Sequence, residues 1–318
     1  MPIKKGIPPD DKQNLHPRNK NRQRYDLKAM TLTVPELSKI IQPNKRGTDS
    51  INFSDPAAVR LLNKAILHHY YGIANWEFPK ENLCPPIPGR AEYIHHIADL
   101  LSEDNKGEIP RGEQITCLDI GAGASCIYPI IGVTAYDWNF IAADIDPIAI
   151  KSAQRIIRAN PSLRGKIVCK LQPNTNLIFR RIIEPSDKIE VTICNPPFHA
   201  SAEEALKGAQ RKIKNLTGKN TRTPKLNHAG NNTELIYEGG EVQFITNMIV
   251  ESKIFAKQCL WFTTLVSKEA NLAKVDRALQ KKNPLAIKTL DIKTGNKKSR
   301  VVAWTFFKEE ERKEWWKN

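Results

Sequence analysis

Short apolar runs alternate with segments of helical periodicity from residue 107 to the C-terminal part of the chain, and this alternation limits the fold more than any other sequence feature. Strands of a mostly parallel sheet are covered on both faces by the connecting helices, so they are almost continuously apolar. We expect strands at 114–120, 138–144, 167–171, 189–194, 259–266, 287–292 and 299–307. The last run follows a Gly-Asn turn and is expected to be an antiparallel hairpin partner. The sequence therefore predicts an α/β fold with helices on both faces of a mostly parallel sheet.

The rest of the chain divides by composition. Residues 1–50 are rich in proline and basic residues and lack helical or strand periodicity, which predicts a basic, flexible N-terminal arm. Residues 51–106 are expected to form a helical module, in which Asp55 caps one helix and a rigid proline-rich linker at 83–90 precedes a second. The α/β core is expected at 107–308, with a basic loop at 199–238. A C-terminal tail follows at 309–318, and its Trp315 and Trp316 either dock on the sheet or belong to a frayed helix.

The charge of the chain favours a polyanionic partner. The 318 residues contain 49 Lys and Arg against 34 Asp and Glu, a net charge of +15. Such an excess indicates partners rather than fold. Two stretches concentrate it, because residues 4–28 hold eight basic and three acidic residues and residues 207–225 hold seven basic and no acidic ones. Either stretch alone could be a solvated loop, but two of them favour nucleic acid. The residues expected to bind RNA phosphates are Arg18, Lys20, Arg22, Arg24, Lys207, Arg211, Lys212 and Lys214.

Other classes of protein are not expected. No run of 18 or more apolar residues is present, so we expect no membrane span. The first residues lack the apolar core of a secretory signal. The six cysteines are scattered, with no CxxC pair, which predicts buried free thiols rather than disulfides or a metal site. These features together predict a cytoplasmic protein.

Two predicted strands end in residues suited to a nucleoside ligand. Asp119-Ile120-Gly121-Ala122-Gly123 allows a tight turn and a close approach of ligand to backbone. The dinucleotide-binding pattern has a third glycine three residues later, but Cys126 stands there, which argues against NAD. Asp144 ends the next strand, and its carboxylate can accept hydrogen bonds from two ribose hydroxyls. The sequence at this point suits either NAD or S-adenosylmethionine.

A third predicted strand ends in Asn195-Pro196-Pro197-Phe198. The two prolines remove backbone donors and stop the strand ladder. The amide oxygen of Asn195 and the carbonyl oxygen of Pro196 remain as acceptors, and Phe198 adds a flat ring. This combination is suited to a planar amine. The alternative is a proline-terminated strand followed by a core phenylalanine.

These strand ends together resemble class I S-adenosylmethionine-dependent methyltransferases that act on amines. More closely, residues 88–96 (PGRAEYIHH), 119–129 (DIGAGASCIYP) and 238–241 (EGGE) resemble the bacterial RlmF family. The resemblance extends from about residue 15 to about residue 307. It implies a Rossmann-like, seven-stranded sheet with a reversed last strand. It also implies methylation of the exocyclic N6 amine of one adenosine in 23S ribosomal RNA, as free RNA or within an assembling large subunit, with no metal.

The same resemblance implies roles for individual residues. Arg90 is expected to meet the carboxylate of the cofactor methionine. Asp119, Gly121 and Gly123 are expected to pass under the methionine and ribose, and Asp144 to hold the ribose hydroxyls. Thr175 is expected near the adenine of the cofactor. Asn195 and Pro196 are expected to take the target amine, with Phe198 stacked on a flipped base and Pro197 counted with them in the catalytic motif.

Three rival functions remain open. A protein glutamine methyltransferase uses a similar turn, usually with tyrosine in the fourth position. A DNA adenine methyltransferase would meet the same amine in a flipped base. A catalytically silent RNA-binding relative is disfavoured by the intact set of Arg90, Asp144 and Asn195. The charge distribution favours RNA, with the loop at 199–238 expected to cover the base as a mobile gate.

Overall fold

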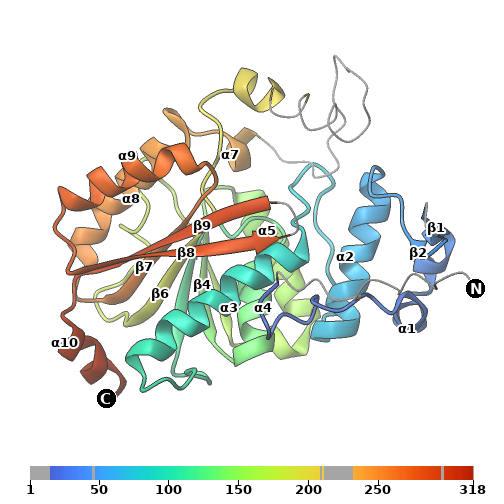
Figure 1. Cartoon of the computed structure of the whole chain (residues 1–318), viewed down its shortest axis with the longest axis horizontal. Helices are drawn as coiled ribbons and strands as arrows, with labels where there is room; N and C mark the ends of the chain where they lie inside the picture. The colour runs from blue at the N-terminus through green and yellow to red at the C-terminus, as the bar shows by residue number, and fades with distance from the viewer. Residues whose placement is uncertain (1–14, 45–46, 208–209, 211–231, 295–296, 318) are drawn as a thin grey trace, which may run out of the picture.

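A seven-stranded sheet forms the centre of the molecule (Figure 1). The computed structural model describes residues 15–44, 47–207, 210, 232–294 and 297–317. The strand order is β5-β4-β3-β6-β7-β9-β8, in which only β9 runs antiparallel to its neighbours β7 and β8. The strands are β3 (Thr116–Ile120), β4 (Asn139–Asp144), β5 (Ile167–Leu171), β6 (Ile189–Cys194), β7 (Cys259–Val266), β8 (Ala286–Thr294) and β9 (Lys297–Thr305). The predicted fold and the reversed last strand are confirmed.

Helices cover both faces of this sheet (Figure 1). On one face lie α3 (Ile87–Asp104), α4 (Ile127–Tyr136) and α5 (Pro147–Ala159), whose apolar side chains share one buried cluster with the strands. On the other face lie α8 (Gly240–Ser252) and α9 (Glu269–Gln280), which share a second cluster. All six residues of β6 and all eight of β7 are buried, because both strands lie centrally between the two helical layers. This explains why the two strands lack alternation and read as continuous apolar runs.

The N-terminal module contains α2 (Pro56–Tyr71), which begins where the sequence predicts. The Asp55 side chain accepts a hydrogen bond from the Ala57 N–H at 2.9 Å and so caps the helix. The expected linker at 83–90 is shorter than predicted, because α3 already begins at Ile87. Pro88 lies in the first turn of α3, where its missing N–H would have had no helical partner.

The first 50 residues were expected to be a flexible arm, and this is wrong for residues 15–44. They contain α1 (Leu27–Thr33), a 3₁₀ helix (Pro35–Ile40) and β1 (Gln42–Pro43), which pairs with β2 (Asp49–Ser50). Leu15, Met30 and Leu37 are buried. Side-chain hydrogen bonds to α3 anchor the segment, among them Asn19 Nδ2 to Glu92 Oε1 at 2.6 Å. Residues 1–14 lie outside the described part.

The C-terminal residues 309–317 dock on the core instead of forming a free tail. They contain α10 (Glu309–Glu314) and a 3₁₀ turn (Trp315–Lys317). The Arg312 guanidinium lies 3.0 Å from both carboxylate oxygens of Asp104, and both side chains are buried. Trp315 donates its indole N–H to Glu190 at 3.0 Å. The described helices include none that is both long and apolar enough to cross a membrane.

Candidate active site

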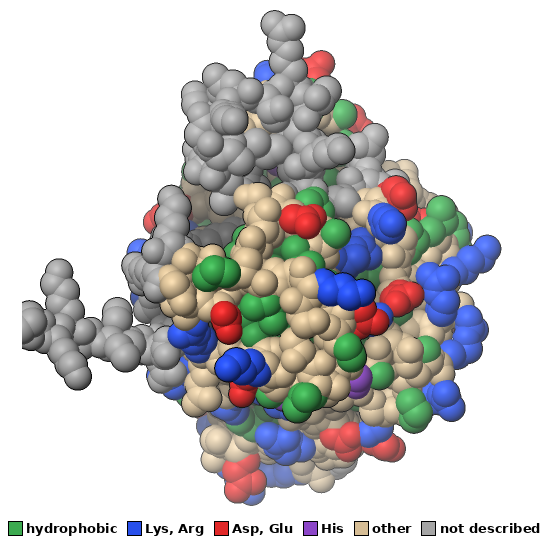
Figure 2. Space-filling model, turned by 90° about the vertical axis from the view of Figure 1, so that its right-hand side faces the viewer, with side chains coloured by type: hydrophobic (Ala, Val, Ile, Leu, Met, Phe, Trp, Pro, Cys, Tyr) green, Lys and Arg blue, Asp and Glu red, His purple; other side chains and the backbone are tan. Residues whose placement is uncertain are grey.

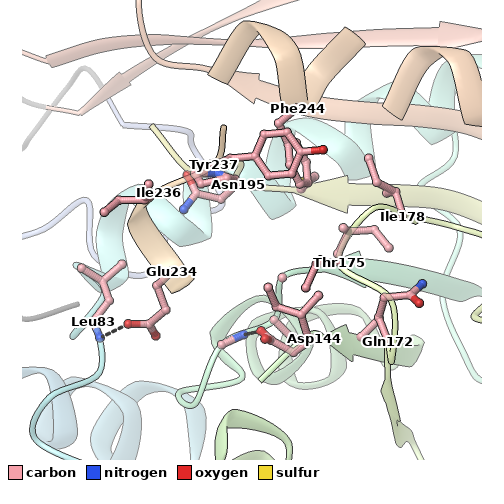
Figure 3. Close-up of a pocket in the computed structure, with 18 of the residues that line it drawn as sticks. Leu83, Asp144, Gln172, Thr175, Ile178, Asn195, Glu234, Ile236, Tyr237 and Phe244 are labelled. Carbon is pink, nitrogen blue, oxygen red and sulfur yellow. Dashed lines mark hydrogen bonds between the residues drawn. The ribbon is translucent and has the colours of Figure 1, made fainter. Parts of the chain in front are cut away.

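A pocket of about 990 Å³ opens at the carboxyl ends of β3, β4 and β6, where ligands bind in open α/β sheets. Among the residues predicted from the sequence, those that line it are Arg90, Gly121, Gly123, Asp144, Thr175, Asn195 and Pro197. Figure 3 shows Asp144, Gln172 and Thr175 on one side of this space and Asn195, Ile236 and Tyr237 on the other. The structure therefore brings the two predicted half-sites, one for a nucleoside and one for an amine, into a single cavity.

The glycine turn after β3 presents bare backbone to the pocket. Gly121 and Gly123 have φ values of +75° and +66°, a region that side chains disfavour. The N–H groups of Gly121 and Ala122 donate to the Ala143 carbonyl at 2.9 and 3.0 Å, which fixes the turn to the end of β4. Cys126, at the position of the missing third glycine, is buried with φ +50°. The backbone at Cys126 is therefore left-handed even though a side chain is present.

Two carboxylates flank this turn, the half-buried Asp144 and the fully buried Asp119. Asp144 accepts the Gly123 N–H at 2.8 Å and the Asp146 N–H at 2.9 Å, one on each oxygen. Burial outweighs these bonds and raises the pKa of Asp144 to about 6. Asp119 is fully buried, and neither of its carboxylate oxygens has a hydrogen-bond partner in the described structure. Burial, with the nearby Asp144, raises the pKa of Asp119 well above its usual range.

Asp144 lines the pocket and fits a cofactor with hydroxyl donors, whereas Asp119 is fully buried and is not among the lining residues, so its predicted contact with the cofactor stays a prediction. S-adenosylmethionine carries an ammonium group, a sulfonium and two ribose hydroxyls, and a buried acceptor without a partner is costly until such a donor arrives. Arg90, predicted to meet the cofactor carboxylate, also lines the pocket. Its guanidinium lies 5.5 Å from the centre of the Tyr128 ring, and both residues line the pocket. The charges present therefore match those of S-adenosylmethionine.

A third acid at the pocket was not predicted from the sequence. Glu234, on the short helix α7 (Asn232–Leu235), accepts from the Leu83 N–H at 3.0 Å and from Asn82 Nδ2 at 3.1 Å (Figure 3). A Cβ built on Gly123 would lie 3.8 Å from Glu234 Oε1, so this carboxylate lies close to the glycine turn. Its charge adds to the rise in the pKa of Asp144. No local signal distinguishes Glu234, because its partners are about 150 residues away.

The strand β6 ends at Cys194, and the predicted amine-binding turn follows at once. Asn195 and Pro197 line the pocket, whereas Pro196 is buried. Phe198 is half-buried next to them, and its stacking role stays a prediction. His199 then pairs with the segment after α7, since its N–H donates to the Leu235 carbonyl and its carbonyl accepts from the Tyr237 N–H, both at 3.0 Å. The turn is thus held at both ends.

The aromatic residues found in the pocket lining are Tyr128, Tyr237 and Phe244. Tyr237 and Phe244 meet edge to face at 5.1 Å, and the Tyr237 hydroxyl accepts from Asn247 Nδ2 at 2.8 Å. Gly239 and Gly240, with φ values of +78° and +68°, make the turn between Tyr237 and α8. The sequence analysis noted this Gly-Gly pair for its resemblance but did not identify Tyr237 or Phe244. The paired glycines were the only local signal of a turn there.

A buried carboxylate on α8 fixes the loop that carries Thr175. Glu251 accepts three consecutive backbone N–H groups, from Ile178 at 2.9 Å, Phe179 at 3.0 Å and Arg180 at 2.5 Å. Gln172, Thr175 and Ile178 of this loop line the pocket. Glu251 thus fixes the backbone that directly follows Thr175, which the sequence did not reveal, and the role of Thr175 near adenine stays a prediction.

The basic residues predicted to bind RNA have diverse surroundings. Arg18 donates to Asp99 at 2.6 Å and to the Tyr136 hydroxyl at 2.9 Å, and Lys20 donates to the Tyr70 carbonyl at 2.7 Å. Both therefore help to anchor the N-terminal segment, and their contact with RNA phosphates stays a prediction. Arg22 is half-buried, and Arg24 and Lys207 are exposed. Arg211, Lys212 and Lys214 lie outside the described residues. Within the described chain, no group of three His, Cys, Asp or Glu side chains could hold a metal ion.

The fold and the site define a class I S-adenosylmethionine-dependent methyltransferase. The sheet order is that of the predicted fold, and the glycine turn, the acid at the end of β4 and Asn195 line one cavity. A family model described as RNA methyltransferase matches residues 10–308, and the chain belongs to this family.

Comparisons with individual proteins agree with that assignment. The chain is 47% identical to the ribosomal RNA large subunit methyltransferase F of Photobacterium profundum, over 99% of this chain and 98% of the relative. It is 50% identical to the protein of the same name from Flavobacterium johnsoniae, over 96% and 97%. Among solved structures, the catalytic domain of human METTL16 in complex with a MAT2A 3′UTR hairpin aligns with a TM-score of 0.76 at 28% identity, covering 92% of this chain and 96% of that one. The N-terminal domain of human METTL16 in complex with SAH aligns with a TM-score of 0.72 at 25% identity, over 92% and 99%.

The raised pKa of Asp144 leads to a testable pH dependence. On the predicted role of Asp144, the ribose hydroxyls of a cationic cofactor bind its ionised carboxylate, so we expect affinity to be full well above pH 6 and to be lost as the pH falls through about 6. We expect the dissociation constant of S-adenosylmethionine, measured by calorimetry between pH 5 and 8, to rise about tenfold per pH unit below that point. In Asp144→Asn the step near pH 6 should disappear, although binding is weaker throughout. A step of unchanged size in Asp144→Asn would assign the titration to another group, with Asp119 the first candidate.

Proposed function

We propose that this protein transfers the methyl group of S-adenosylmethionine to the N6 amine of one adenosine in 23S ribosomal RNA. One observation carries the proposal: the nucleoside half-site around Asp144 and the amine half-site at Asn195 share one continuous cavity. The names of its relatives support ribosomal RNA of the large subunit as the substrate. The METTL16 neighbour in complex with an RNA hairpin supports RNA in general.

The residues at the end of β6 suit the chemistry of an adenine amine. The lone pair of this amine is delocalised into the ring, so the amine is a weak nucleophile. Acceptors on Asn195 and Pro196 would hold its two hydrogens and favour the pyramidal geometry needed for attack. S-adenosylmethionine, when bound, supplies an electrophilic methyl group. Positioning and electrostatics would then provide most of the rate, without a general base before transfer.

The target base must leave its stack to reach this cavity, at a cost of a few kcal/mol that is smallest for a loop or bulge. Stacking on an aromatic side chain returns about 1–3 kcal/mol. Phe198 is the stacking partner predicted from the sequence, and Tyr237 and Phe244 add an aromatic wall near Asn195 (Figure 3). We therefore infer that the substrate adenosine is unpaired in the RNA.

Phosphate contacts around the base would come from scattered basic residues. Figure 2 shows Lys and Arg side chains spread over the face that carries the N-terminal module, with acidic side chains among them. Arg24 and Lys207 are exposed and are proposed to take part. The net charge of +15 supports such contacts, which bind RNA without reading its sequence. We propose a cytoplasmic location, where ribosomal RNA or an assembling large subunit is available.

A parallel transfer assay tests the function directly. Tritium from labelled S-adenosylmethionine is followed into total RNA, DNA and protein, and into large-subunit particles, with RNA taken from a strain that lacks the gene. We expect label in 23S RNA, on N6 of one adenosine. Label in protein on glutamine, or in DNA, would establish one of the rival activities instead. An absence of transfer to all substrates, with intact cofactor binding, would favour a silent RNA-binding protein.

A second expected result concerns the basic loop. Neutralising Lys207, Arg211, Lys212 and Lys214 together should weaken RNA binding and reduce the slope of log affinity against log salt by up to about 3, since each phosphate contact contributes about 0.7 for single strands. Filter binding at several salt concentrations measures this slope. Cofactor affinity should stay the same. An unchanged slope would exclude phosphate contacts by these four residues.

A further inference from the structure

The strands β6 and β7 separate just below the amine-binding turn. Their ladder pairs Ile189 with Cys259 and Val191 with Trp261, and it ends there. On the other side, β6 stays paired with β3 as far as Cys194. The last three residues of β6 are therefore held by backbone pairing on one side only. Asn195 follows immediately after Cys194. The contacts on the side of β6 that faces β7 therefore help to set the position of Asn195.

Side-chain hydroxyls take over where the ladder stops. The Tyr93 hydroxyl lies 2.8 Å from Thr263 Oγ1 and accepts a hydrogen bond from the Cys194 N–H at 3.4 Å. Thr263 in turn donates its hydroxyl to the Thr192 carbonyl at 2.6 Å, and its N–H donates to Thr192 Oγ1 at 3.2 Å. The donors and acceptors form one directed chain, from the Cys194 N–H through Tyr93 and Thr263 to the Thr192 carbonyl.

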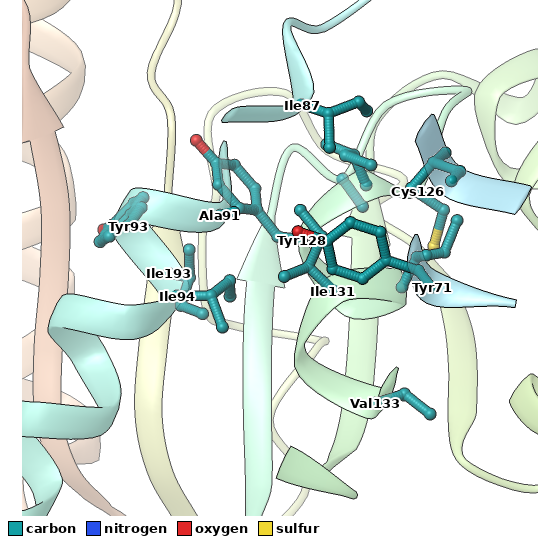
Figure 4. Close-up of a cluster of buried hydrophobic side chains, with 14 of the residues drawn as sticks. Tyr71, Ile87, Ala91, Tyr93, Ile94, Cys126, Tyr128, Ile131, Val133 and Ile193 are labelled. Atoms are coloured by element: carbon teal, nitrogen blue, oxygen red, sulfur yellow. The ribbon is translucent and has the colours of Figure 1, made fainter. Parts of the chain in front are cut away.

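Tyr93 reaches this gap from α3, the helix that also carries Arg90. It is fully buried and lies beside Ile193 of β6 (Figure 4). Its ring meets the Tyr128 ring edge to face at 5.4 Å, and Tyr128 lies beneath the Arg90 guanidinium in the pocket lining. Tyr93 thus contacts both Tyr128, which packs against Arg90, and Cys194, the last residue of β6 before Asn195.

We propose that Tyr93 is a positioning residue. Its hydroxyl replaces the backbone hydrogen bond that β7 does not make to Cys194, and it thereby fixes the position of Asn195 relative to the bound cofactor. The inference rests on the proposed function, because it concerns the same amine-binding turn. Its physical basis is the precision that in-line transfer requires: a misplacement of about 1 Å can cost roughly 100-fold in rate. Tyr93 itself touches no substrate in this role.

The test compares variants that remove single hydroxyls. Tyr93→Phe keeps the ring and its packing but frees the Cys194 N–H, and Thr263→Val removes the next hydroxyl in the chain. We expect kcat to fall about tenfold or more in each, with the KM for RNA and the dissociation constant of S-adenosylmethionine within about twofold. Thr263→Ser, which keeps the hydroxyl, should restore most of kcat. Because both variants break one chain, the double variant should be little worse than either alone.

Tyr136→Phe is the matched control, since it also removes a buried tyrosine hydroxyl, one bonded to Arg18 and His95. It should lose stability without losing kcat. Amide hydrogen exchange gives a readout that does not depend on activity: the Cys194 amide should exchange faster in Tyr93→Phe and remain protected in Tyr136→Phe. An unchanged kcat and an unchanged Cys194 exchange rate in Tyr93→Phe would overturn the positioning role. Failure of the wild type to methylate any RNA, with altered Cys194 exchange in Tyr93→Phe, would instead overturn the proposed function alone.

Discussion

Replacing Asn195 by alanine should lower the rate of methyl transfer by roughly 100- to 1,000-fold, while the affinity for S-adenosylmethionine changes by no more than a few-fold. The magnitude is that of losing one preorganised polar group at a reacting centre. The separation of the two effects follows from the geometry. Asp144, the glycine turn and Arg90 lie on other elements of the same cavity and are untouched by the substitution. Single-turnover transfer to 23S RNA and calorimetric titration with the cofactor measure the two quantities.

Two further variants sharpen this prediction. Asn195→Asp keeps an oxygen acceptor of the same shape, so it should retain more activity than the alanine variant. Asn105→Ala, in the loop that follows α3, removes an amide that donates to the Glu108 carbonyl at 2.8 Å, far from the pocket lining, and should leave transfer unchanged. Turnover near the wild-type rate in Asn195→Ala would mean that the amide oxygen does not hold the target amine, and the proposed chemistry would have to be abandoned.

The sheet was predictable because its strands form short apolar runs, continuous in the central strands β6 and β7, which are buried on both faces. The boundaries of β5, β6 and β7 coincide with the apolar runs in the sequence. For β6 the reason is visible in the residues: Pro196 removes a backbone donor directly after Asn195, so the strand cannot continue. The start of α3 was misplaced because a run of prolines indicates extended chain, although a proline in the first helical turn is compatible with both conformations.

The N-terminal segment shows where such reasoning fails. Residues 15–25 are ordered by side-chain contacts rather than by a repeating backbone pattern. His16 and Arg18 both bond Asp99, and Asn19 bonds Glu92, each more than 70 residues away along the chain. Periodicity cannot report such contacts, and a run of polar and basic residues has the composition of a disordered arm. The same contacts explain why Arg18, predicted to bind RNA, is engaged within the protein.

The residues of the candidate site also fall into two groups, those that the sequence predicted and those that it missed. Residues at strand ends, such as Asp144 and Asn195, were identified because a parallel sheet brings the carboxyl ends of its strands to one edge. Residues contributed by later segments were missed, among them Glu234, Tyr237 and Glu251. Their partners lie far along the chain, as when Glu251 binds the backbone of 178–180. Only the three-dimensional arrangement shows that they complete the pocket and fix its walls.

The docking of the C-terminal helix should be a large contribution to stability, because it contains a buried ion pair. The Arg312 guanidinium lies 3.0 Å from Asp104, and the Trp261 indole N–H donates to the same carboxylate at 2.8 Å. Arg312→Met removes the cation and leaves a buried carboxylate with a single neutral donor. We expect the free energy of unfolding, measured by urea denaturation, to fall by roughly 3–5 kcal/mol.

A second experiment changes Asp104, the partner of Arg312, and compares the cost of Arg312→Met in the two backgrounds. In an Asp104→Asn background the buried group at position 104 is neutral, so Arg312→Met should cost much less than it does beside the carboxylate. Arg277→Met, on the exposed face of α9, serves as the matched control and should change stability by less than about 0.5 kcal/mol. Equal losses at position 312 in the two backgrounds would show that packing of the side chain, and not its charge, holds the C-terminal helix on the core.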